Sequence, residues 1–73
     1  MPLPDNVRQF VRSAKRDMRR LERRIEAITL TYGEEPSDQQ VAKTLEALCE
    51  QWTNLRFAIA NARTAARDGM MAH

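Results

Sequence analysis

The 73-residue sequence contains few of the residues that form catalytic sites, metal sites or disulfide bonds. It has one cysteine, Cys49, and one histidine, His73, which is the last residue. A lone cysteine excludes an internal disulfide, and no histidine accompanies it in the pattern as a base or fellow ligand. Glycine-rich phosphate loops and metal-ligand spacings are also missing. We therefore expect no enzyme activity, no catalytic residue, no metal and no cofactor.

Long apolar runs are equally scarce. No run approaches the roughly 20 residues that a membrane-spanning helix needs, and the N-terminus lacks the apolar stretch of a secretory signal. We expect a cytoplasmic protein with no membrane contact. A chain of this length predicts a single domain, residues 1–73, whose core contributes only roughly 3 to 5 kcal/mol. So small a core favours association with a partner or with a second copy.

What the sequence does have is a regular apolar repeat. Apolar residues advance by alternating steps of four and three in each half of the chain, a spacing typical of helices that meet along a supercoiled seam. The seam positions are Val7, Val11, Ala14, Met18, Leu21, Ile25, Ile28 and Tyr32, then Val41, Leu45, Leu48, Trp52, Leu55, Ile59, Ala62 and Ala66. Facing positions have numbers that sum to 73, which predicts an all-α, coiled-coil-like antiparallel two-helix hairpin.

Capping signals set the expected ends of both helices. Asp5 or Asn6 is the expected first cap, and Gly33 suits a left-handed stop. Ser37 and Gln40 form a capping-box pattern at the start of the second helix. These signals predict a first helix at about 5–32, a turn at 33–37, a second helix at about 38–68 ending near Asp68-Gly69, and a tail at 69–73.

Side-chain size differs between the two ends of the expected hairpin. Layers near the turn are bulky, as where Leu21 faces Trp52, whereas layers near the termini contain alanine. Burial of large aliphatic side chains stabilises more, so the turn end is expected to hold the hairpin together.

Cys49 flanks the seam and is expected to be a buried, inert thiol. Phe10 flanks the seam at the thin end, and a four-helix bundle of two hairpins would complete the packing.

Two features outside the seam are candidate partner-binding sites. Arg12, Arg16, Arg19 and Arg23 line one outward face of the first helix, where like charges repel one another. Their guanidinium groups suit carboxylate or phosphate, although the pattern also fits a solvated face. Phe57 is expected to point outward beside Thr53, Ala60 and Thr64 on an uncharged patch, with Phe10 as a second apolar candidate.

The pattern favours a non-catalytic protein–protein interaction module that binds and regulates a larger protein with an acidic surface. Small bacterial or phage adaptors, inhibitors and co-chaperones are proteins of this kind, and a homodimer is expected. One alternative is a nucleic-acid-binding hairpin dimer that uses the basic face of the first helix. The modest net charge of +2 and the absence of aromatics among the arginines argue against it. Another alternative is a structural subunit of a larger helical assembly.

Overall fold

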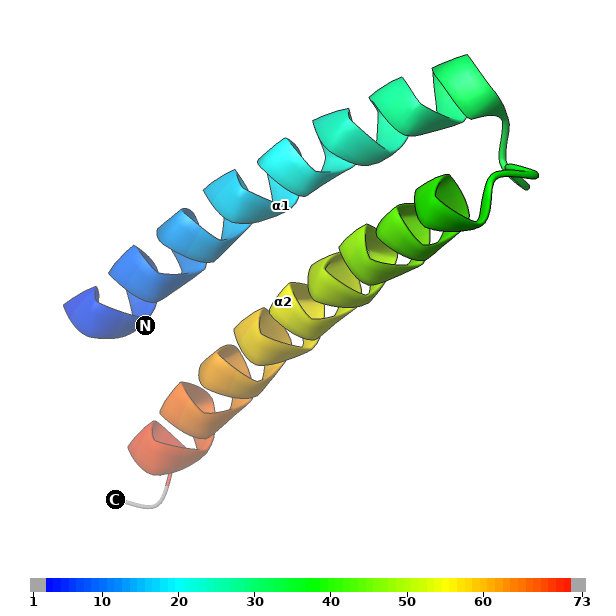
Figure 1. Ribbon diagram of the computed structural model, residues 1–73. Helices are drawn as coiled ribbons and strands as arrows, with labels where there is room; N and C mark the ends of the chain where they lie inside the picture. Colours follow the sequence, from blue (N-terminus) through cyan, green and yellow to red (C-terminus); the bar gives the residue numbers. More distant parts are fainter. Residues whose placement is uncertain (1–2, 72–73) are drawn as a thin grey trace.

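The computed structural model describes residues 3–71 and consists of two antiparallel helices, α1 (Asp5–Tyr32) and α2 (Gln39–Met71). Figure 1 shows them side by side along their length, with both ends of the chain opposite the connecting turn. The molecule is a rod of 54 × 17 × 13 Å. The expected all-α hairpin is confirmed. Neither helix is long and apolar enough to cross a membrane.

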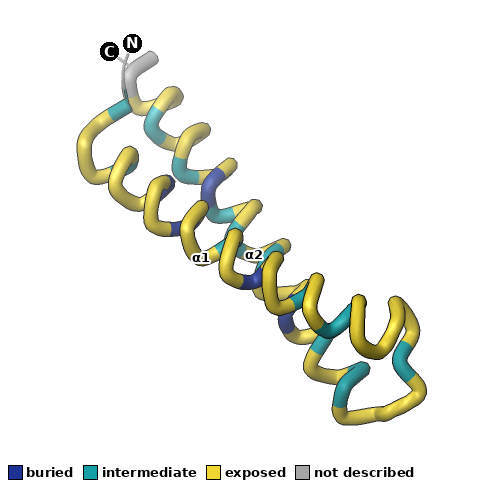
Figure 2. Tube along the Cα trace, turned by 90° about the horizontal axis from the view of Figure 1, so that it is seen from above, coloured by how far each residue is buried: buried dark blue, intermediate teal, exposed yellow. Residues whose placement is uncertain are grey.

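The predicted seam is the surface on which the helices meet. The buried hydrophobic residues of the described chain are Val11, Ala14, Leu21, Leu48 and Ile59, and each occupies a seam position. Figure 2 shows them along the facing sides of the two helices. Val11, Ala14 and Ile59 form one cluster, against which Val7, Met18 and Leu55 pack. This grouping fits the expected facing pairs Ala14 with Ile59 and Met18 with Leu55.

Burial along the seam decreases in the layers nearest the turn, against the expectation from side-chain size, although Leu21 and Leu48 further along the same half are buried. The buried cluster lies in the half of the hairpin that contains the termini, whereas Ile28 and Leu45 near the turn are only half-buried. Tyr32, expected to close the last layer, is 55% exposed. A groove of about 360 Å³ lies between the helices here, lined by Ile28, Tyr32, Gln40, Val41 and Thr44. Bulky side chains cannot be covered where the helices leave such a space between them.

Helix α1 begins and ends close to the expected residues. Pro4 occupies the position before its first turn, and no side chain caps it, so the expected cap at Asp5 or Asn6 is wrong. Asn6 Oδ1 accepts a hydrogen bond only from the adjacent Val7 amide, at 2.9 Å. Gly33 ends the helix with a φ of 84°, and its amide donates to the Thr29 carbonyl at 2.8 Å. Glycine adopts this conformation without the penalty that a Cβ would bring, as expected from the sequence.

Helix α2 differs from the expectation at both ends. Asp38, not Ser37, caps it, because Asp38 Oδ1 accepts from the amides of Gln40 at 2.8 Å and Val41 at 3.2 Å. The capping box of Ser37 and Gln40 is therefore wrong. The helix does not stop at Asp68 and Gly69 but continues to Met71. Residues 69–71 of the expected tail are thus helical, and residues 72–73 lie outside the described part of the chain.

Candidate interaction surfaces

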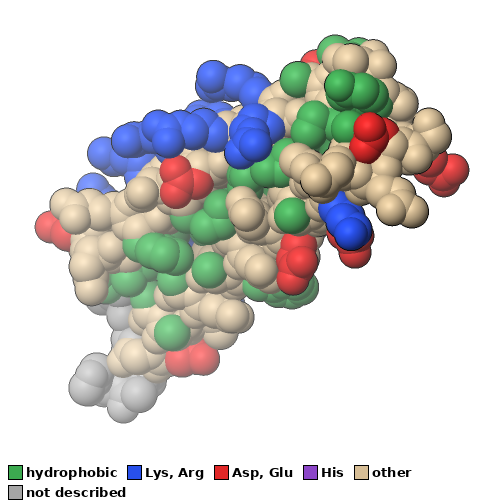
Figure 3. Space-filling view, viewed as in Figure 1, with side chains coloured by type: hydrophobic (Ala, Val, Ile, Leu, Met, Phe, Trp, Pro, Cys, Tyr) green, Lys and Arg blue, Asp and Glu red, His purple; other side chains and the backbone are tan. Residues whose placement is uncertain are grey.

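The arginine stripe lies on the outward side of α1. Arg12, Arg16, Arg19 and Arg23 are all exposed, as are the neighbouring cations of the same helix. In Figure 3 the blue Lys and Arg side chains gather along the α1 side of the hairpin. Arg12 and Arg23 are 11 positions apart, about 17 Å at 1.5 Å per residue. The stripe presents guanidinium groups to any acidic surface that approaches this side of the hairpin.

A long part of α2 carries almost no charge on its outer surface. Between residues 51 and 66 the only ionisable side chains are Arg56 and Arg63, which are seven residues apart and so share one side of the helix. Phe57 is 63% exposed, confirming that it points away from α1. Its neighbours at helical spacing, Ala60 and Thr64, are exposed too. We call Thr53, Phe57, Ala60 and Thr64 the uncharged face of α2.

The structure does not bring the predicted partner-binding residues together into one site. Arg16 and Phe57 occupy outward positions of different helices, so the arginine stripe and the uncharged face lie on opposite sides of the hairpin. Phe10 is 44% exposed near the termini, where the heptad register places it beside the alanines of α2. A partner must therefore contact one side of the hairpin or wrap around it.

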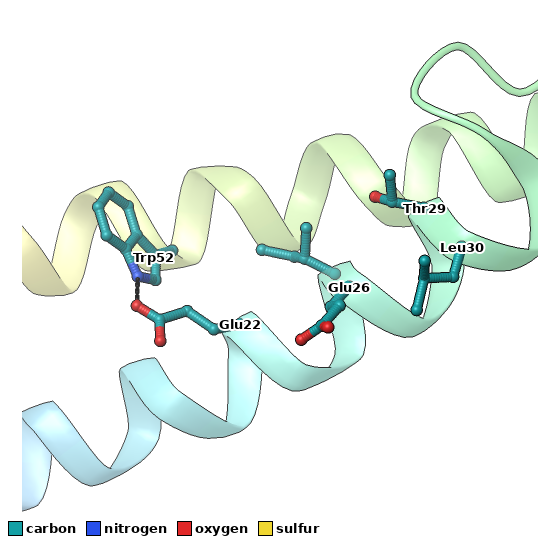
Figure 4. Close-up of a pocket in the computed structure, with 6 residues that line it drawn as sticks. Glu22, Glu26, Thr29, Leu30 and Trp52 are labelled. Carbon is teal, nitrogen blue, oxygen red and sulfur yellow. Dashed lines mark hydrogen bonds between the residues drawn. The ribbon is translucent and has the colours of Figure 1, made fainter.

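Trp52 occupies a different environment from the one expected from its seam position. It is only half-buried, and its Nε1 donates a 2.9 Å hydrogen bond to Glu22 Oε1. The Arg56 guanidinium lies 5.7 Å from the centre of the ring. Figure 4 shows Trp52 reaching from α2 toward the side chains of α1. The expectation that Trp52 packs in the seam opposite Leu21 is met in part, since the indole is half-buried and its N–H donates to Glu22 of the facing helix.

Trp52 forms one wall of a shallow groove of about 300 Å³, here called the acidic groove. Its lining residues are Glu22, Ile25, Glu26, Thr29, Leu30 and Trp52. Leu30, 79% exposed, is the most exposed large apolar residue of the described chain. The apolar floor bordered by two carboxylates suits a partner that offers an apolar side chain beside cations.

A second groove, of about 340 Å³, lies near the termini and is here called the basic groove. Its lining residues are Leu3, Arg8, Val11, Arg12, Lys15 and Arg63. Three cations come from α1 and one from α2, around the apolar side chains of Leu3 and Val11. Sequence reasoning singled out Arg12 but missed the other cations, although the spacing of Arg8, Arg12 and Lys15 by four and three is visible in the chain.

Cys49 is exposed, so the expectation of a buried thiol is wrong. Among residues 3–71 no group of three or more His, Cys, Asp or Glu side chains is placed to hold a metal ion.

Comparison with known proteins gives no matching family model, no similar curated protein and no similar solved structure.

Proposed function

We propose that this chain is a non-catalytic interaction module, a cytoplasmic homodimer of four helices that binds and regulates a larger protein as a small adaptor, inhibitor or co-chaperone. The observation that carries the proposal is the uncharged face of α2. Phe57 is 63% exposed there, on a molecule in which 30% of residues are charged. Large aromatic side chains are enriched at the buried centres of protein interfaces.

The arginine stripe supports an acidic partner. Its cations are exposed, and like charges at these spacings destabilise a helix by a few tenths of a kcal/mol per pair. A partner carboxylate removes that repulsion and accepts two hydrogen bonds from one guanidinium group. Binding by the stripe would chiefly accelerate association and set the orientation of the partner.

The outward position of Phe57 allows a matched test. Phe57→Glu and Ala27→Glu both place a carboxylate at an exposed apolar position, one on each helix, without removing a seam contact. We expect Phe57→Glu to lose capture of the partner from an extract of the source organism by about tenfold or more, since it buries an unpaired charge. Ala27→Glu should retain capture, and circular dichroism should show equal helicity. Equal capture by Phe57→Glu and the unsubstituted chain would refute this assignment.

The arginine stripe gives a second test, which also addresses nucleic acid. Replacing Arg12, Arg16, Arg19 and Arg23 with glutamine should preserve helicity and weaken partner binding. If the partner is RNA or DNA, log affinity falls linearly with log salt, with a slope that reports several released counterions. If the glutamine variant binds the partner with unchanged affinity, the stripe is a solvated face with no role in binding. A structural subunit would instead co-purify in a fixed-stoichiometry assembly of many copies.

A further inference from the structure

The two grooves are the same structural feature repeated along α1 with opposite charge. The basic groove is lined in α1 by Arg8, Val11, Arg12 and Lys15. The residues 14 positions further along the chain, Glu22, Ile25, Glu26 and Thr29, line the acidic groove. Fourteen residues are two heptads, so both grooves lie on the same edge of the hairpin, about 21 Å apart at 1.5 Å per residue. An apolar seam residue, Val11 or Ile25, forms the floor of each.

The charge of the whole hairpin follows the same division. Residues 1–20 and 56–73, which form the half with the termini, contain nine Lys and Arg against three Asp and Glu, a net charge of +6. Residues 21–55, which form the half with the turn, contain three Lys and Arg against seven Asp and Glu, a net charge of −4. Two such molecules attract each other when they lie side by side in opposite directions, and they repel each other in parallel.

We infer that the occupant of both grooves is a second copy of this chain, paired antiparallel through this edge about a two-fold axis. The inference deepens the homodimer of the proposed function by assigning its surface. Facing residues of the two α1 helices then have numbers that sum to about 37, which places Lys15 opposite Glu22 and Arg12 next to Glu26 of the other copy. A two-fold axis forms each of these contacts twice.

The length of α1 also fits this pairing. The ends of α1, residues 5 and 32, also sum to 37, so the register that matches the grooves aligns the two α1 helices over their full length. Arg16, Arg23 and Phe57 occupy the outermost position of the heptad and remain outside the paired edge.

Charge reversal at one contact tests the inference. Lys15→Glu and Glu22→Lys each convert two attractive contacts into two repulsive ones, so each variant alone should dimerise at least roughly tenfold more weakly in sedimentation equilibrium. A 1:1 mixture of the two variants should form a heterodimer, because each reversed charge then meets its opposite. The double variant should dimerise within about threefold of the unsubstituted chain. Lys15 and Glu22 are exposed, so the helicity of each variant should not change. Glu22→Lys also removes the acceptor of the Trp52 hydrogen bond, so Lys15→Glu, which removes no such bond, is the cleaner of the two variants.

Matched controls carry the same charge changes at exposed positions away from this edge. Arg20→Glu and Glu50→Lys should leave the dimer dissociation constant within about threefold of the unsubstituted chain. A monomeric unsubstituted chain would overturn the inference, as would failure of the mixed variants to associate or equal weakening by the controls. Partner capture through Phe57 does not depend on this edge. If Lys15→Glu captures the partner as a monomer, the partner-binding proposal stands and the dimer is not needed for capture. If only Phe57→Glu loses capture, the proposed dimer through this edge is unaffected.

Discussion

The half of the hairpin that contains the termini and the half that contains the turn differ in packing and in charge. The first has small seam residues, a buried cluster around Val11 and Ile59, and excess cations. The second has larger seam residues, of which Leu21 and Leu48 are buried while those nearest the turn, around Leu45, are half-buried, and it has excess carboxylates. The comparison teaches that side-chain size sets how much area is available for burial, whereas the distance between the helices sets how much is buried.

Alanine is the physical reason for the difference. Ala14 is 4% exposed within the buried cluster, and small residues of this kind let two helix backbones approach closely. Branched neighbours such as Ile59 are then covered by the opposite helix. Near the turn the opposed side chains are larger, and a groove remains between Ile28 and Val41.

The largest expected effect tests this comparison directly. Ile59→Ala removes a side chain from the buried cluster and should lower the free energy of unfolding by about 2 to 5 kcal/mol, enough to unfold much of the protein. Leu45→Ala removes a half-buried side chain and should cost about half as much. Urea denaturation followed by circular dichroism at one protein concentration measures both, because dimer formation makes stability depend on concentration. A greater loss for Leu45→Ala would reverse the assignment of the more stable half.

A smaller effect is expected at the start of α2. Asp38→Ala removes the acceptor for two amides and should destabilise the protein by about 1 kcal/mol. Ser37→Ala should change the free energy of unfolding by less than about 0.5 kcal/mol, because Asp38 supplies the cap. The same denaturation experiment compares the two. If Ser37→Ala lowers the free energy of unfolding as much as Asp38→Ala does, Ser37 caps the helix as the sequence predicts.

Effects of a similar size, but of opposite sign, are expected from one substitution at two glycines, one in each half. Gly33→Ala places a Cβ on a residue with a φ of 84° and should destabilise by about 1 kcal/mol, although no atom lies within 4 Å of that Cβ. Gly69→Ala lies within α2, also in open space, and should stabilise the helix by up to about 1 kcal/mol. Thermal unfolding measures the two shifts, which should have opposite signs. Destabilisation by Gly69→Ala would indicate that α2 ends before it.

The sequence predicts which residues of the candidate surfaces point outward, but it does not predict the contacts that these residues make with the other helix. The outward positions of Phe57 and Leu30 follow from heptad register, since a residue opposite the seam has no helix to cover it. The hydrogen bond from Trp52 to Glu22 joins residues 30 apart and depends on the rotamer of the indole, which no periodicity specifies. The basic groove likewise needs Arg63 of α2 beside the cations of α1.

By itself the sequence determined the two helices, their seam, the glycine at the end of α1 and the opposite charges of the two halves. These properties depend on local propensity, on a 3.5-residue repeat and on counting charges, all of which are present in the order of the residues. Only the tertiary structure decided where the seam is tightly packed, that Cys49 and Tyr32 are exposed, and that two grooves of opposite charge share one edge. Those properties depend on the distance between two helices at each layer, which is set jointly by side chains that lie far apart in the chain.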